Sequence, residues 1–215
     1  MIGSTNYVAF IILGISYQSW QGIALWEAAN MFRNELNTGQ IDYTFTCPFS
    51  RYFYIVCNIA ASAVQSTIFF LPLFCVGLYF TMETVTPLGL LLGLSATLIS
   101  VAALAQLGAI FASLVLRYRE VTAIFGFFNF AFQMLTGMFV PFQLLPLPLQ
   151  IIGYCLPITF GMDLMRHYLM KTIPIMPVTY EWIVLLVELV VLALIAKLAV
   201  LYLEKTAKEQ GLHYL

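Results

Sequence analysis

The chain has 215 residues, of which 62% are hydrophobic and 9% are charged. Soluble domains contain about 45–50% apolar and about 25% charged residues, so this composition indicates a protein of the lipid bilayer. With a mean hydropathy of +0.94, it excludes a nucleic-acid-binding protein, a disordered tail, a disulfide-stapled secreted module and most soluble enzymes. The net charge of −1 says little about partners, but the positions of the charged residues predict a topology.

Stretches without charged residues predict the membrane crossings, because a spanning helix needs about 20 mostly apolar residues. The gaps between charges predict helices within residues 1–26, 52–82, 84–116 and 121–140, and a fifth over 182–203 that only Glu188 and Lys197 interrupt. Aromatic residues near the expected helix ends are typical of interfacial anchors; they are Trp20, Trp26, Tyr52, Tyr54, Trp182 and Tyr202. We therefore predict an all-α protein with five transmembrane helices.

The stretch after the fourth crossing differs from a lipid-facing helix. Its prolines cannot all lie in one unbroken helix, and its charged residues are costly at membrane depth. These residues are Pro141, Pro146, Pro148, Pro157, Asp163, Arg166, His167 and Lys171. We interpret residues 141–171 as a re-entrant hairpin that enters from the outer side and returns. A full crossing is the alternative, and charge alone does not decide between them.

The basic residues predict the orientation, since Lys and Arg accumulate on the cytoplasmic side of membrane helices. With a re-entrant hairpin, this rule places Arg166 and Lys171 outside, and it places inside Arg33, Arg51, Arg117, Arg119, Lys205 and Lys208. The first apolar run lacks the basic start and cleavage site of a signal peptide, so it is expected to be retained as a helix. The prediction is a multi-pass plasma-membrane protein with the N-terminus outside and residues 204–215 as a cytoplasmic tail.

No group of residues predicts chemistry by this chain alone. A Gly-rich phosphate loop, a nucleophile paired with a base, and clustered metal ligands are all missing from the sequence. His167 and His213 are isolated, and the four cysteines have no metal-ligand spacing. We therefore expect a protein that is not an enzyme and that binds no cofactor or metal itself.

Residues 28–50 form the most informative cytoplasmic segment. Apolar residues alternate there with polar ones near helical spacing, which predicts an amphipathic helix along the membrane surface that ends near Thr38 and Gly39. A solvated loop with a surface helix is the alternative. Pro48 ends any helix before the second crossing begins.

Two ordered sets of residues resemble one family. Arg33, Glu35, Gly39, Ile41, Asp42, Pro48, Ser50 and Arg51 are similar to the cytoplasmic segment of type-2 ATP-binding-cassette (ABC) exporter permeases. The family's late signature resembles a second set, made of Thr136, Gly137, Met138, Phe139, Val140, Pro141, Leu145, Pro146, Leu149, Gln150, Leu156, Pro157, Ile158, Thr159, Asp163 and Arg166. The sequence departs from the family at Val140 and Leu156, and the family's first helix has no counterpart.

The resemblance implies a single transmembrane permease domain over residues 1–215 that works with a second permease copy and a separate ATPase subunit, which holds ATP and Mg²⁺. Its cargo would be hydrophobic or amphiphilic: a drug, a lipid or a lipid-linked glycan. The ATPase contacts would be Arg33, Glu35, Gly39, Asp42, Pro48 and Arg51, with a second contact at Arg117, Arg119 and Glu120 that is alternatively only a positive-inside anchor. The outer hairpin and gate would contain Gly137, Phe139, Pro141, Pro146, Pro157, Asp163 and Arg166.

Three polar residues within apolar stretches have local interpretations. Asp163 and Arg166 are one helical turn apart, so we expect them to pair on one face. Glu188 lies seven residues after Glu181 on the same helical face; it either lines a pathway or is satisfied by another helix or a partner. The rival functions are an ATP-independent channel or secondary carrier that uses Glu188 and the hairpin, and a non-transporting scaffold subunit.

Overall fold

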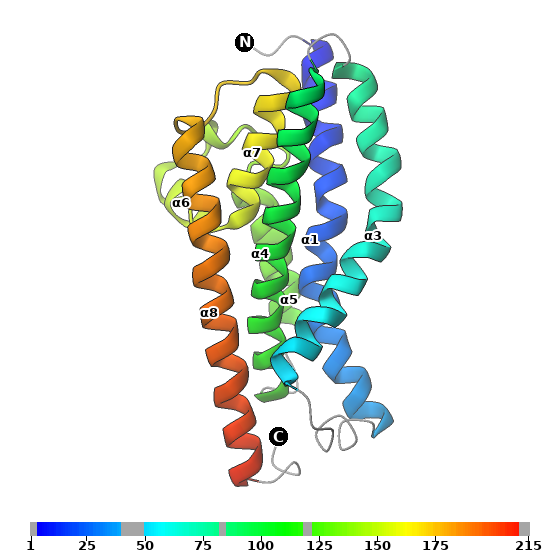
Figure 1. Cartoon of the computed structure of the whole chain (residues 1–215), viewed down its shortest axis with the longest axis vertical. Coiled ribbons are helices and arrows are strands. Elements are labelled where there is room, and N and C mark those ends of the chain that lie inside the picture. Colours follow the sequence, from blue (N-terminus) through cyan, green and yellow to red (C-terminus); the bar gives the residue numbers. More distant parts are fainter. Residues whose placement is uncertain (1–3, 40–49, 82–84, 118–121, 211–215) are drawn as a thin grey trace.

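The computed structural model describes residues 4–39, 50–81, 85–117 and 122–210. These residues form helices and turns without a β-strand (Figure 1). The elements are α1 (Ser4–Thr38), α3 (Arg51–Thr81), α4 (Pro87–Arg117), α5 (Thr122–Leu135), η1 (Phe142–Leu144), α6 (Leu147–Gly153), α7 (Pro157–Met170) and α8 (Val178–Gln210). The predicted all-helical fold is therefore confirmed for the part of the chain that the structure describes.

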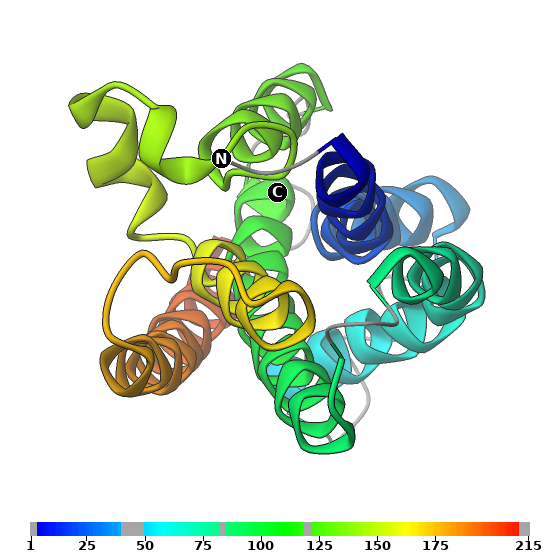
Figure 2. The same ribbon diagram turned by 90° about the horizontal axis from the view of Figure 1, so that it is seen from above.

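The helices form a bundle in which α1 and α4 are central. Helix α1 packs against α3, α4, α5 and α7, and α4 packs against α7 and α8. Seen from above, the short elements η1 and α6 project from the bundle on the side away from α3 (Figure 2). We call the end where α7 ends and α8 begins the hairpin end. The opposite end, where α1, α4 and α8 end and α3 and α5 begin, is called the basic end after the arginines and lysines in its sequence segments.

Three helices within the described ranges are long and apolar enough to cross a membrane. They are Arg51–Thr81, Pro87–Ser113 and Val178–Tyr202, and the bent pair α6 and α7 would make a fourth span. On α8, Trp182 and Tyr202 are 20 residues apart, or about 30 Å at about 1.5 Å per residue. This spacing equals the hydrocarbon thickness of a bilayer, so both aromatic side chains lie where interfacial anchors are expected.

The prediction of five straight crossings is not confirmed: among the described residues, neither α1 nor α5 is one of the candidate spans. Helix α5 has only 14 residues, or about 21 Å, and it ends at Leu135 instead of continuing to Val140. The chain then turns at Gly137, whose φ is +77°. Helix α1 is long but carries polar side chains inside the bundle: the buried Gln21 donates to the Asn129 carbonyl oxygen of α5 at 3.2 Å.

A separate amphipathic helix over residues 28–38 is not confirmed either, because α1 continues without interruption to Thr38. No proline or glycine occurs in this segment, and Met31 packs into an apolar cluster with Ile55 and Ile59 of α3. The helix ends where predicted, since Gly39 has a φ of +70° and left-handed glycine is a common helix terminator.

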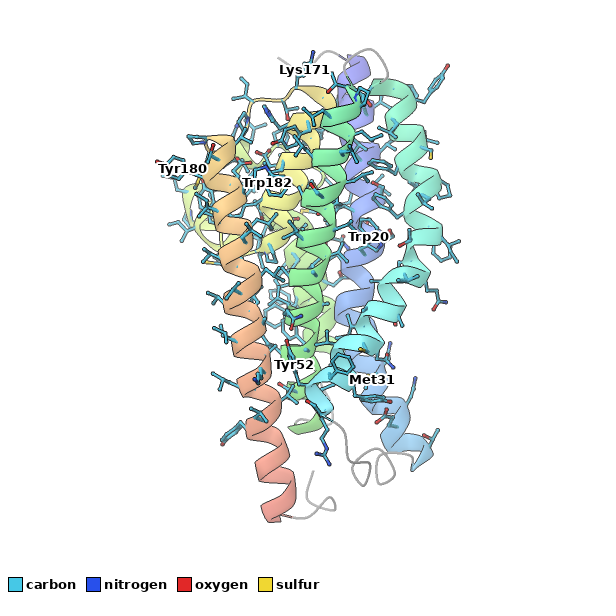
Figure 3. The ribbon with its side chains drawn as sticks, viewed as in Figure 1. Trp20, Met31, Tyr52, Lys171, Tyr180 and Trp182 are labelled. Carbon is cyan, nitrogen blue, oxygen red and sulfur yellow. The ribbon has the colours of Figure 1, made fainter. Side chains whose placement is uncertain are left out.

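The main apolar core lies toward the hairpin end. Leu13, Tyr17 and Trp20 of α1 meet Phe70 and Phe74 of α3 there, together with Leu104 of α4 and Ile158, Met162, Met165 and Leu169 of α7. Trp20 stacks on Phe70 with ring centroids 3.8 Å apart, and it lies well inside the bundle (Figure 3). The prediction that Trp20 is an interfacial anchor is therefore wrong.

Candidate functional site

The predicted hairpin is a broken helical segment made of η1, α6 and α7. Helices α6 and α7 meet at an angle of 93°. The prolines stand where elements begin: Pro141 precedes η1, Pro146 precedes α6 and Pro157 is the first residue of α7. Proline is favourable at a helix start and unfavourable inside a helix. The proline spacing therefore divides this segment into short elements.

Arg166 of α7 is the buried cation at the centre of this region. Its side chain is 4% exposed. Nη1 donates to the Gly137 carbonyl oxygen at 2.8 Å, and Nη2 donates to those of Met138 at 2.8 Å and Phe10 at 2.9 Å. The guanidinium carbon also lies 3.4 Å from the centroid of the Phe10 ring. Carbonyl dipoles and an aromatic face thus compensate the charge at membrane depth.

The bonds of Arg166 also explain why α5 ends early. The carbonyl groups of Gly137 and Met138 are directed to a side chain of another helix instead of continuing a helical ladder. A residue with a Cβ at Gly137 would be strained by the positive φ, and its Cβ would lie 3.2 Å from the Phe142 Cβ. Arg166 therefore holds α7, α1 and the turn after α5 together.

Asp163 and Arg166 lie on one face of α7 and their charges interact, but the hydrogen bonds of Arg166 among the described residues go to backbone carbonyl groups. Asp163 Oδ2 instead accepts a hydrogen bond from the Ile175 N–H at 2.8 Å. The neighbouring Met176 N–H donates to Glu181 Oε1 at 2.8 Å, and Glu181 is fully buried. Two carboxyl groups thus hold consecutive amides of the loop that joins α7 to α8.

A cavity of about 470 Å³ opens at the hairpin end. Phe10 of α1, the turn at Gly137 and Phe142, and Asp163 and Arg166 of α7 line it, and residues 171–173 of the following loop border it. The predicted hairpin residues Gly137, Pro141, Asp163 and Arg166 therefore surround one space, whereas Phe139 packs against the main core. Pro146 and Pro157 shape the segment without lining this cavity.

The basic end brings together part of the predicted ATPase contact set. Glu35 near the end of α1 is 7% exposed, and the Tyr54 hydroxyl of α3 donates to its Oε1 at 2.5 Å. Gly39 is exposed after α1, and Arg51 is the first residue of α3. Glu35 thus lies within the contact between α1 and α3 and joins these two helices.

The other predicted contacts are only partly described. Arg33 and Arg117 belong to α1 and α4, and their side chains lie outside the description. Four further contacts lie entirely outside the described residues: Asp42, Pro48, Arg119 and Glu120. On α8, Glu188 is half-buried, and its Oε2 has no hydrogen-bond partner among the described residues.

Sequence reasoning missed Phe10, Tyr54 and Glu181 as functional neighbours. Glu181 lies in the first turn of α8, where acidic residues favour a helix start, so its position carried a usable signal. Phe10 carried no signal, because one phenylalanine in an apolar helix does not reveal that its ring and carbonyl group meet a distant arginine.

The comparisons with known proteins identify one family. A family model described as "ABC-2 family transporter protein" matches residues 3–198. No curated protein matches the chain significantly.

Proposed function

The chain belongs to the ABC-2 family of transporter proteins, and from this premise we propose that it is the transmembrane permease subunit of an ATP-driven exporter. The family membership makes it a multi-pass transmembrane transport component that is not itself catalytic. The observation that carries the proposal is the extent of the match, which covers residues 3–198 and so includes both the basic end and the hairpin.

In the proposed mechanism, a separate ATPase subunit binds ATP and Mg²⁺ and acts on the basic end. The end of α1, the start of α3 and the segment between them supply its contact through Arg33, Gly39, Asp42, Pro48 and Arg51, with a second contact at Arg117, Arg119 and Glu120. The burial of Glu35 against Tyr54 supports a different role for Glu35. It joins the ends of α1 and α3, so that both helices move together when the ATPase closes.

In this proposal the protein lies in the plasma membrane. The hairpin end faces outside the cell, and the C-terminus lies in the cytoplasm. The positive-inside rule supports this orientation, since most basic residues belong to segments of the basic end. The hairpin closes the outer side while Arg166 holds it to α1. The cargo is hydrophobic or amphiphilic, and the complete exporter contains a second permease copy.

One observation favours a rival function. Glu188 is a half-buried carboxyl group within an apolar span, and its Oε2 has no described partner. Intramembrane carboxyl groups commonly mark ion or proton paths. An ATP-independent carrier that uses Glu188 is therefore the second candidate, and a scaffold subunit without transport is the third.

The test is co-purification from native membranes with a C-terminal tag in mild detergent. We expect a phosphate-loop ATPase in near-equal amount by mass spectrometry. Asp42→Lys should abolish co-purification of the ATPase, because it reverses a charge in the contact. The matched control, Lys197→Glu on α8, should leave co-purification of the ATPase unchanged. A folded, inserted chain without any ATPase would contradict the proposal.

A further inference from the structure

The cavity at the hairpin end contains two buried polar groups that lack partners. The Arg166 Nε–H and the Thr172 hydroxyl are both buried without a hydrogen-bond partner among the described residues, and both residues line the cavity. Buried polar groups in proteins are nearly always partnered. Their presence beside one cavity therefore indicates a ligand that accepts hydrogen bonds.

The charges around the cavity favour an anion. Arg166 and Lys171 are the basic side chains among its lining residues, and Asp163 is the acidic one. Asp163 Oδ2 already accepts the Ile175 N–H. Lys171 is exposed at the rim, and its left-handed backbone, with a φ of 53°, ends α7 there. A guanidinium, an ammonium and a hydroxyl group together match the several acceptor oxygens of a phosphate group.

The position of the cavity favours a phosphate group that belongs to an amphiphile. Lys171 lies at the hairpin end, beyond the level of Tyr180 and Trp182 (Figure 3), and such aromatic residues mark the depth of lipid headgroups. Leu144 and Ile173 line the same cavity, yet their side chains are 73% and 82% exposed. Apolar chains can therefore lie on this rim while the headgroup enters the cavity.

We propose that this cavity, bordered by Phe10, Gly137, Arg166, Lys171 and Thr172, binds the phosphate-bearing headgroup of a membrane amphiphile. This site lies within one copy of the chain and does not depend on an ATPase partner. It therefore goes beyond the proposed function, and either can fail without the other.

The test is native mass spectrometry of the full chain in dodecyl maltoside, which contains no phosphate. Three probes are titrated separately: phosphatidylglycerol, dioleoylglycerol, which has the chains without the phosphate, and sodium phosphate. We expect phosphatidylglycerol to bind at least tenfold more tightly than dioleoylglycerol, because only it satisfies the buried donors. Equal binding of the two lipids would overturn the proposal.

Variants assign the binding to this cavity. Lys171→Asn keeps a residue that tolerates the left-handed conformation and should weaken phosphatidylglycerol binding about fivefold. Asp163→Asn keeps an acceptor for the Ile175 N–H but removes a negative charge, so it should tighten binding. Opposite effects of two neighbouring substitutions cannot both result from misfolding.

The matched control is Lys197→Asn, which removes a lysine of α8 far from the cavity and should leave the affinity unchanged. Equal weakening by Lys171→Asn and Lys197→Asn would overturn the proposal, because the lipid would then respond only to total charge. Sodium phosphate that displaces the lipid at comparable concentration would identify free phosphate as the ligand and overturn the assignment to an amphiphile.

Discussion

Helices α3 and α7 are both apolar, but the chain surrounds them very differently. In α7, ten of 14 residues are buried, whereas α3 buries seven residues spread over 31 positions. Apolar side chains of α3 such as Val64 and Ile68 are exposed, as expected for a helix that faces lipid. Helix α7 contains Asp163 and Arg166, whereas α3 has no charged residue after Arg51. Of these two helices, the one that carries charge within its length is therefore the one that protein groups surround.

Proline shows the same contrast. Pro72 lies inside α3 without ending it, whereas Pro141, Pro146 and Pro157 stand at the starts of short elements. In the hairpin, Arg166 donates hydrogen bonds to the carbonyl groups that the broken helix leaves free. Irregular backbone is tolerated at membrane depth only where protein groups satisfy it. Arg166 and the broken segment therefore depend on each other.

The largest effect is expected from Arg166→Leu, which removes three hydrogen bonds to α1 and the turn. Three carbonyl groups lose their donor, so we expect a loss of about 3–5 kcal/mol of unfolding free energy. Thermal unfolding in detergent measures it. Lys197→Leu is the matched control and should change stability little. Equal melting temperatures for both variants would contradict the conclusion that Arg166 stabilises the broken segment.

A smaller loss is expected from Gly161→Ala in α7. A Cβ there would lie 2.5 Å from the Ser100 Oγ of α4 and 2.7 Å from the Tyr17 hydroxyl of α1, so overpacking should cost about 1–3 kcal/mol. Gly126→Ala of α5 has open space and should be neutral. Adding Ser100→Gly to Gly161→Ala should restore part of the lost unfolding free energy. No restoration would mean that the contact with Ser100 does not cause the loss.

At the basic end, Tyr54→Phe removes the hydrogen bond to Glu35 and should lower the free energy of unfolding by about 1 kcal/mol. Tyr79→Phe is the control, because Tyr79 is 68% exposed on the same helix. If Glu35 joins α1 to α3, Tyr54→Phe should also reduce ATP-dependent transport while ATPase binding persists. A loss of ATPase binding instead would mean that this pair touches the partner directly.

The smallest effect is expected from Glu188→Gln. An ATP-driven permease does not need this carboxyl group to ionise, so export by reconstituted vesicles should change less than about twofold, within the range of an ordinary surface substitution. A tenfold loss together with lost dependence on an ion gradient would favour the carrier instead.

The sequence predicted those features of the fold that depend on neighbouring residues. The apolar stretches of α3, α4 and α8, the end of α1 at Gly39 and the breaks at the hairpin prolines each follow from neighbouring residues. The sequence failed where distant contacts decide. Arg166 bonds to Phe10, which is 156 residues away in the chain, so the i to i+3 spacing suggested Asp163 as its partner instead. The same contacts shorten α5, which apolar length alone predicted to reach Val140.

In the proposed orientation, the hairpin end faces outside and the basic end faces the ATPase. Single cysteines at Lys171 and at Lys208, in a chain whose four native cysteines are serine, test it directly in intact cells with an impermeant maleimide. We expect Lys171→Cys to react at once, whereas Lys208→Cys should react only after permeabilisation. The reverse pattern would contradict it.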